Sequence, residues 1–142
     1  MTDQASAPPN TPWHVWIVGV LLTLWGAFGA WDFTATITRF RPYLDMFPPD
    51  MLTYFLNAPW YAYLGWGLGT WGGLIGGVLV LLRNKRAVPA LVLSLLGAAL
   101  SFALCFFDPP PQSDPVFSGA IVAVSLAFLG YAFWLARRGV LR

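Results

Sequence analysis

The sequence is poor in charge. Only 10% of its 142 residues are Asp, Glu, Lys or Arg, against about 25% in an ordinary soluble domain. It contains no glutamate, so all six acidic residues are aspartates. A chain with 58% hydrophobic residues and so few charges has the composition of a multi-pass membrane protein and not of a soluble domain.

Cysteine and histidine are also scarce. Cys105 is the only cysteine, which excludes an internal disulfide, a CxxC redox pair and a cysteine-based zinc site. His14 is the only histidine, which excludes a haem held by two histidines of one chain. No paired carboxylate with a nearby base, Ser/His/Asp set or phosphate-binding glycine loop is present. We therefore expect a non-enzymatic protein with no metal and no cofactor.

Four apolar runs are long enough to cross a bilayer. Because the stretch at 48–57 begins with two prolines, which suit a helix start, and continues with closely spaced apolar side chains, we also expect a helix in the interface there. The predicted fold is an all-α bundle of four transmembrane helices, with that short interfacial helix in the first outer loop. Residues 1–12 are expected to be a flexible cytoplasmic tail, and 13–142 a single membrane domain. The predicted spans are 13–31, 60–82, 87–107 and 116–135.

The end of the first span is left open between residue 31 and about residue 40, because the β-branched residues after Asp32 favour a helix in water only weakly.

The orientation in the membrane follows from the basic residues. Six of them flank the spans on the side that carries both termini, and two lie in the loops of the other side. The positive-inside rule then places both termini in the cytoplasm. These basic residues indicate topology and not a nucleic-acid partner.

Half of the glycines lie in the second span, which runs from Trp60 to Leu82 without a charge. Six of them fall within a sector of about 140° on a helix, and small residues of the first span could face them. Such faces allow close helix packing, either within the chain or between protomers. Gly67 lies outside the sector, so alanine is expected to be tolerated there. The predicted packing residues are Gly65, Gly69, Gly72, Gly73, Gly76, Gly77, Gly26 and Ala30.

Asp32 is the ionisable residue closest to the membrane interior on the outer side. In a continuous helix it shares a face with Thr36 and Arg39, so one interpretation is an interfacial ion pair with Arg39. The other is a ligand or proton site at the outer mouth, because carboxylates within membranes usually have a function. Trp66 interrupts the glycine face and is a candidate for the same site, although it could also fill a gap between helices.

Four features of the sequence form a recognisable pattern: Asp32, Thr36, the start of the second span at Ala58-Pro59-Trp60, and the glycine run that ends in a basic turn. With this pattern the chain resembles a group of small four-span proteins. Members of this group belong to the inner membrane of alphaproteobacteria and are often labelled as sugar transporters. The resemblance covers about residues 15–105. It implies a multi-pass protein of the bacterial inner membrane.

The leading functional hypothesis is a non-enzymatic membrane protein that forms an oligomer, or joins a larger membrane complex, through its glycine-rich helix faces. Its partners would be the lipid bilayer and either further copies of the chain or other membrane proteins. The alternative is a transporter of small, sugar-like solutes that acts as an oligomer. Neutral solutes need no buried charge, and the second, third and fourth predicted spans contain none.

Overall fold

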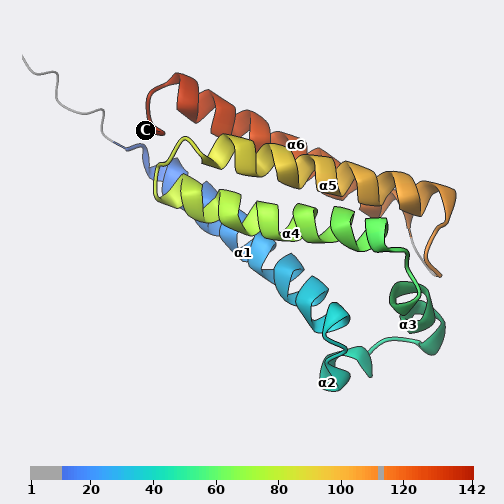
Figure 1. The fold of residues 1–142 in the computed structure, drawn as a ribbon. Coiled ribbons are helices and arrows are strands. Elements are labelled where there is room, and N and C mark those ends of the chain that lie inside the picture. Colours follow the sequence, from blue (N-terminus) through green and yellow to red (C-terminus); the bar gives the residue numbers. More distant parts are fainter. Residues whose placement is uncertain (1–10, 112–113) are drawn as a thin grey trace, which may run out of the picture.

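The computed structural model describes residues 11–111 and 114–142, and this part of the chain is helical, without strands. The tail expected at 1–12 lies almost entirely outside the described residues. The helices are α1 (Trp13–Ile37), α2 (Arg41–Leu44), α3 (Pro49–Leu56), α4 (Trp60–Leu81), α5 (Ala87–Phe107) and α6 (Pro115–Arg137) (Figure 1).

Four helices, α1, α4, α5 and α6, are long and apolar enough to cross a membrane. The sequence predicted the bounds of the last three to within two residues. Their length has a simple cause, because about 20 apolar residues are needed to cross the hydrocarbon core as a helix. The fold is thus an all-helical bundle with the make-up of a multi-pass membrane protein.

Helix α1 extends beyond residue 31 and ends at Ile37. Its last turns contain β-branched threonines whose hydroxyls donate to carbonyls four residues earlier. Thr34 Oγ1 lies 2.6 Å from the Ala30 oxygen, and Thr36 Oγ1 lies 2.8 Å from the Asp32 main-chain oxygen. These bonds satisfy the hydroxyls locally, so the threonines are compatible with a helix in an apolar setting.

Arginines at positive φ terminate both α1 and α4. Arg39 has φ 54°, and the amide of Phe40 donates back to the Ala35 carbonyl at 2.9 Å. Arg83 has φ 55°, and the amide of Asn84 donates to the Leu79 carbonyl at 2.8 Å. In both places the hydrogen bond closes a six-residue turn, which is the Schellman motif. Glycine usually takes the left-handed position of this motif. The chain therefore turns sharply at both sites.

The connection between α1 and α4 carries two short helices. The predicted interfacial helix is present as α3, with Pro49 in its first turn. Helix α2 was not predicted from the sequence. Helix α4 begins at Trp60, the predicted start of the second span, and Pro59 occupies its N-cap position in an extended conformation.

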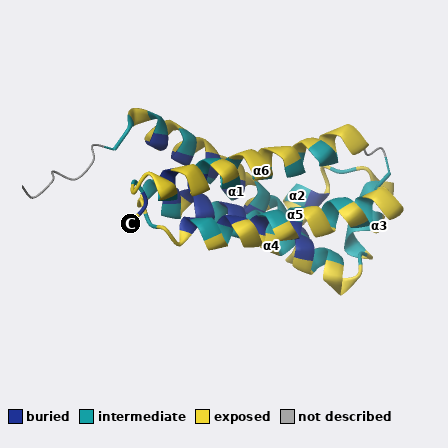
Figure 2. Cartoon of the chain, turned by 90° about the horizontal axis from the view of Figure 1, so that it is seen from above, coloured by how far each residue is buried: buried dark blue, intermediate teal, exposed yellow. Residues whose placement is uncertain are grey.

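The helices form a layer with α4 between α1 and α5, and α6 packs on α5 (Figure 1). The apolar core lies where all four long helices approach each other, near the chain's C-terminus. Its fully buried side chains include Val15, Val80 and Leu135. Helix α6 buries only Ala132 and Leu135, so most of it is exposed (Figure 2).

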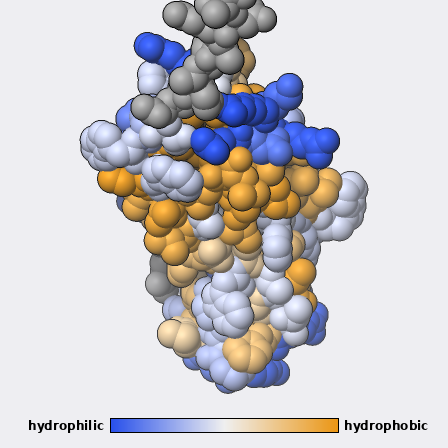
Figure 3. Space-filling view, turned by 90° about the vertical axis from the view of Figure 1, so that its left-hand side faces the viewer, coloured by the Kyte–Doolittle hydropathy of each residue, from blue (hydrophilic) through white to orange (hydrophobic). Residues whose placement is uncertain are grey.

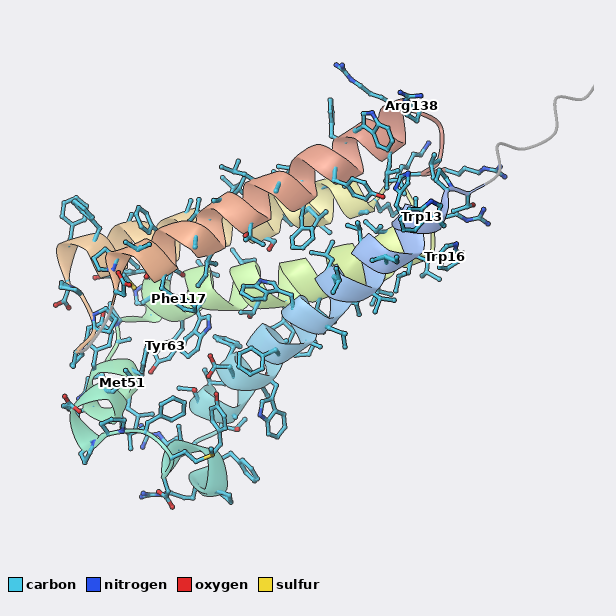
Figure 4. The ribbon with its side chains drawn as sticks, turned by 180° about the vertical axis from the view of Figure 1, so that it is seen from behind. Trp13, Trp16, Met51, Tyr63, Phe117 and Arg138 are labelled. Atoms are coloured by element: carbon cyan, nitrogen blue, oxygen red, sulfur yellow. The ribbon has the colours of Figure 1, made fainter. Side chains whose placement is uncertain are left out.

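The two ends of the bundle differ in chemistry. We call the one with the α4–α5 turn and the C-terminus the basic end, because it has a hydrophilic rim beside an apolar belt (Figure 3). There the Arg142 amide donates to the Arg83 carbonyl at 2.7 Å. Trp13, Trp16 and Arg138 also lie at this end, whereas Met51, Tyr63 and Phe117 lie at the opposite, loop end (Figure 4). The basic side chains of this end are Arg83, Lys85, Arg86, Arg137, Arg138 and Arg142.

Candidate functional site

The glycines of α4 pack against two neighbouring helices of the same chain. Towards α1, a Cβ added at Gly77 would lie 2.7 Å from the Thr23 backbone nitrogen. Gly73 lies between both helices, because its added Cβ would be 3.3 Å from Ser94 Oγ of α5 and 4.0 Å from the Gly26 Cα of α1. Four other glycines face α5, where an added Cβ would approach side-chain or backbone atoms at 2.5–3.3 Å. These four are Gly65, Gly69, Gly72 and Gly76.

The facing helices contribute small residues in return. A Cβ at Gly26 would lie 2.8 Å from the Gly73 carbonyl carbon, and one at Gly97 would lie 2.9 Å from the Leu68 carbonyl carbon. Both would collide with backbone, which cannot move aside as a side-chain tip can. Ala30 is also buried, with 3% of its surface exposed. The predicted packing residues therefore lie in contacts inside one chain.

A hydrogen bond reinforces the contact between α4 and α5. The Ser94 hydroxyl donates to the Gly69 main-chain oxygen over 2.6 Å. A serine can reach the backbone of a neighbouring helix in this way only because glycine leaves that backbone uncovered. This bond was not predicted from the sequence, and a hydroxyl close to a row of glycines is the feature that could have indicated it.

At the loop end the contact between α1 and α4 changes character. Phe33 of α1 and Trp66 of α4 meet edge to face, with ring centroids 5.5 Å apart. Phe55 of α3 lies on Trp66 at the same centroid distance. A Cβ at Gly67 would lie 2.9 Å from Cζ of Phe33, so Gly67 also faces α1 although it is outside the predicted sector. The ring would have to move for an alanine to fit there, which corrects the expectation that alanine is simply tolerated. Aromatic side chains here separate the backbones that glycines bring together elsewhere.

A cavity of about 160 Å³ lies in this widened region. It brings together three of the four residues that the sequence suggested for an outer-mouth site, namely Asp32, Thr36 and Trp66. Residues from α2, α3 and the connection between them close it, and these were not foreseen. They are Leu44, Phe47, Met51, Leu52 and Phe55.

Asp32 is half-buried and accepts a hydrogen bond from Tyr43, whose hydroxyl lies 2.7 Å from Oδ1. Thr36 is buried, but its hydroxyl donates to the main-chain oxygen of Asp32 and not to the carboxylate. Burial and the neighbouring Asp32 carboxylate raise the pKa of the Tyr43 phenol well above its usual range. Tyr43 therefore remains a protonated donor at physiological pH.

The expected ion pair between Asp32 and Arg39 is not formed. Helix α1 ends at Ile37 and the backbone turns at Arg39, so the seven-residue spacing no longer places both side chains on one helical face. Within the described ranges the ion pair observed is Arg41 with Asp45, at 3.8 Å on the exposed surface.

Two tyrosines fasten α3 over the cavity. The Tyr63 hydroxyl of α4 donates to the Phe55 carbonyl at 2.6 Å, and the Tyr54 hydroxyl of α3 donates to the Asp108 carbonyl at 2.6 Å. Burial, with further contributions from Cys105 and Asp108, raises the pKa of Tyr54 to about 12. Neither hydrogen bond was predicted from the sequence. A partly buried phenol usually needs a hydrogen-bond partner, which is the clue that could have predicted the fastening.

The ionisable groups at this site are few. One carboxylate and one phenol lie beside aromatic and aliphatic walls, and the described residues contain no group of three His, Cys, Asp or Glu side chains that could hold a metal ion.

Comparison of the chain with protein-family models, curated proteins and solved structures finds no match.

Proposed function

We propose that the chain is a non-enzymatic protein of the bacterial inner membrane that forms a homo-oligomer or serves as an accessory subunit of a larger membrane complex. The supporting observation is the exposed face of α6. Its small residues are not used inside the chain, and a Cβ added at Gly130 would have no atom within 4 Å. The exposed small residues are Ala120, Ala123, Ala127 and Gly130.

These four residues lie within a sector of about 80° on the helix, and so make one narrow face. Between membrane helices there is little hydrophobic driving force, because lipid tails are as apolar as leucine. Close backbone approach over small residues is one of the main sources of association there. In α4 such residues are already covered by α1 and α5, whereas the α6 face is free to pack against a second protein.

The proposed location follows from the basic end. It carries six Lys or Arg side chains, and the positive-inside rule places such an end in the cytoplasm. The loop end, with the cavity, would then face the opposite side of the membrane. The resemblance to four-span proteins of alphaproteobacteria supports the same location.

Cysteine crosslinking tests the assembly. In a Cys105→Ser background, Ala127→Cys is oxidised in native membranes, and we expect a covalent dimer because closely packed α6 helices bring the two cysteines within bonding range. The matched control is Leu126→Cys, which is exposed but points about 100° away, and should give at least tenfold less product.

Native mass spectrometry in mild detergent tests the alternative that the chain is an accessory subunit. Such a subunit would crosslink poorly to itself but would copurify with a different membrane protein. An isolated monomer in the spectrometer, together with equal or absent crosslinking at both positions, would contradict the assembly proposal.

A second candidate function is the binding or transport of a small solute, and the loop-end cavity with Asp32, Thr36 and Trp66 favours it. The cavity is not continued along the α1–α4 contact, because Gly26 and Gly77 close that contact towards the basic end. Transport would therefore need a path formed with a second copy. Uptake of a sugar panel into proteoliposomes tests this function, and uptake no faster than into empty vesicles would argue against it.

A further inference from the structure

The loop-end cavity contains a carboxylate without a cationic partner. Asp32 Oδ1 accepts from Tyr43, and in the described part of the chain no second side chain donates to the carboxylate and no Lys, Arg or His pairs with it. Holding a charge near the membrane interior without a counter-ion is costly. A ligand that supplied positive charge would relieve that cost, whereas an anion would increase it.

The walls of the cavity favour an organic cation over a metal ion. Phe47, Phe55 and Trp66 line it, and the faces of such rings attract cations. Hard metal ions require several oxygen ligands, and the lining offers one carboxylate and a threonine whose hydroxyl is already donated to the main chain. The same shortage of polar groups disfavours a sugar, because each buried hydroxyl of a sugar would need its own partner.

The volume limits the size of the ligand. About 160 Å³ is close to the volume of engineered protein cavities that hold benzene, so one ring or a short branched alkyl group would fill it. We propose that the loop-end cavity binds a small monovalent organic ammonium ion, with Asp32 as its counter-ion and Trp66 and Phe55 as aromatic walls. This inference rests on the solute-binding candidate and is independent of assembly through α6.

Calorimetric titration of the purified full-length chain in detergent tests the inference with three probes. Benzylammonium carries the charge and one ring, benzyl alcohol has the ring without the charge, and glucose represents the sugar alternative. We expect one saturable site for benzylammonium, at least tenfold weaker binding of benzyl alcohol, and no binding of glucose.

Two pairs of variants locate the site. Asp32→Asn keeps the shape and an acceptor for Tyr43 but removes the charge, and it should weaken benzylammonium binding at least tenfold. The matched control is Asp50→Asn on α3, an exposed aspartate outside the cavity, which should change binding less than twofold. If Asp32→Asn does not fold, Trp66→Phe and Trp66→Leu replace it, and binding should be retained in the first and lost in the second.

The outcomes separate the possibilities. Equal binding of benzylammonium and benzyl alcohol, or binding unchanged in Asp32→Asn, overturns the ammonium inference. So does retention of binding in Trp66→Leu. Binding of glucose but not of benzylammonium overturns it while preserving the solute-binding candidate. If none of the three probes binds, both fail.

Discussion

Helix α4 contains two regions that pack by opposite means. Towards α5 its glycines keep the two helices close from Gly65 to Gly76. Towards α1 they do so only from about Thr70 to the end of α4 at Leu81, where the contact leaves little space. Nearer its start, Trp66 meets the rings of Phe33 and Phe55, and a cavity opens beside them. One helix thus supplies a close-packed part and a part with an internal volume. The difference depends on whether small residues or large rings face the neighbouring helix.

The largest effect is expected in the close-packed part. Gly26→Ala places a Cβ against the backbone of α4 at Gly73, where no flexible side chain can yield. Overpacking of this kind typically costs about 1–3 kcal/mol, and contact with backbone places this variant at or above the top of that range. The free energy of unfolding in mixed detergent micelles measures the loss.

Gly119→Ala is the matched control, because the same substitution on α6 lies outside the proposed assembly face and meets only Phe102 Cε2, at an ordinary contact distance of 3.8 Å. It should change the free energy of unfolding by no more than about 0.5 kcal/mol. Similar losses in both variants would mean that the glycines respond to substitution through the helix itself and not through the α1–α4 contact.

Much of the fold could be predicted because the bilayer sets the length of each span. The end of α1 could not, since intrinsic helix propensity argues against its last threonines, whereas their hydroxyl bonds to the preceding turn favour them. The partners of the glycines also required the structure. The sector of about 140° that holds six glycines of α4 is wider than one neighbouring helix covers, so these glycines pack against two helices.

The candidate site was predictable by residue but not as a cavity. Asp32 was singled out by its charge and Trp66 by its size among glycines, and the structure places both on one cavity. The side chains that close it come from the connection between α1 and α4. The sequence predicted the helix at 48–57 in this connection, but a helix prediction does not say which neighbouring helices its apolar side chains contact. Tyr43 replaces Arg39 as the partner of Asp32 because α1 ends earlier than a continuous helix would.

An intermediate effect is expected where the two regions meet. Gly67→Ala places a Cβ 2.9 Å from Cζ of Phe33, at the tip of a ring that can tilt. We therefore expect a loss of about 1 kcal/mol in the free energy of unfolding, at the low end of overpacking costs. In the double variant Gly67→Ala with Phe33→Leu the collision is removed, so the added cost of the alanine should fall close to zero.

That double variant distinguishes a ring contact from a general intolerance of alanine at Gly67. If the alanine costs as much in the Phe33→Leu background as it does beside the native Phe33, the ring is not what limits this position. The aromatic part would then be less different from the glycine part than the structure indicates.

The smallest effect concerns the hydrogen bond from Tyr43 to Asp32. Tyr43→Phe removes the donor, and the expected loss is at most about 1 kcal/mol, below the usual range for bonds to charged groups because the site is only half-buried. The pKa of Tyr43 is raised from an ordinary value of 10.0, so the bond stabilises the fold fully below that pH and is lost as the pH rises through the elevated folded value. Unfolding of wild type and variant is compared between about pH 6 and 9, where the difference should stay constant. A difference that disappears within this range would mean that the phenol ionises below its ordinary pKa of 10.0, opposite to the direction expected from its burial beside the Asp32 carboxylate.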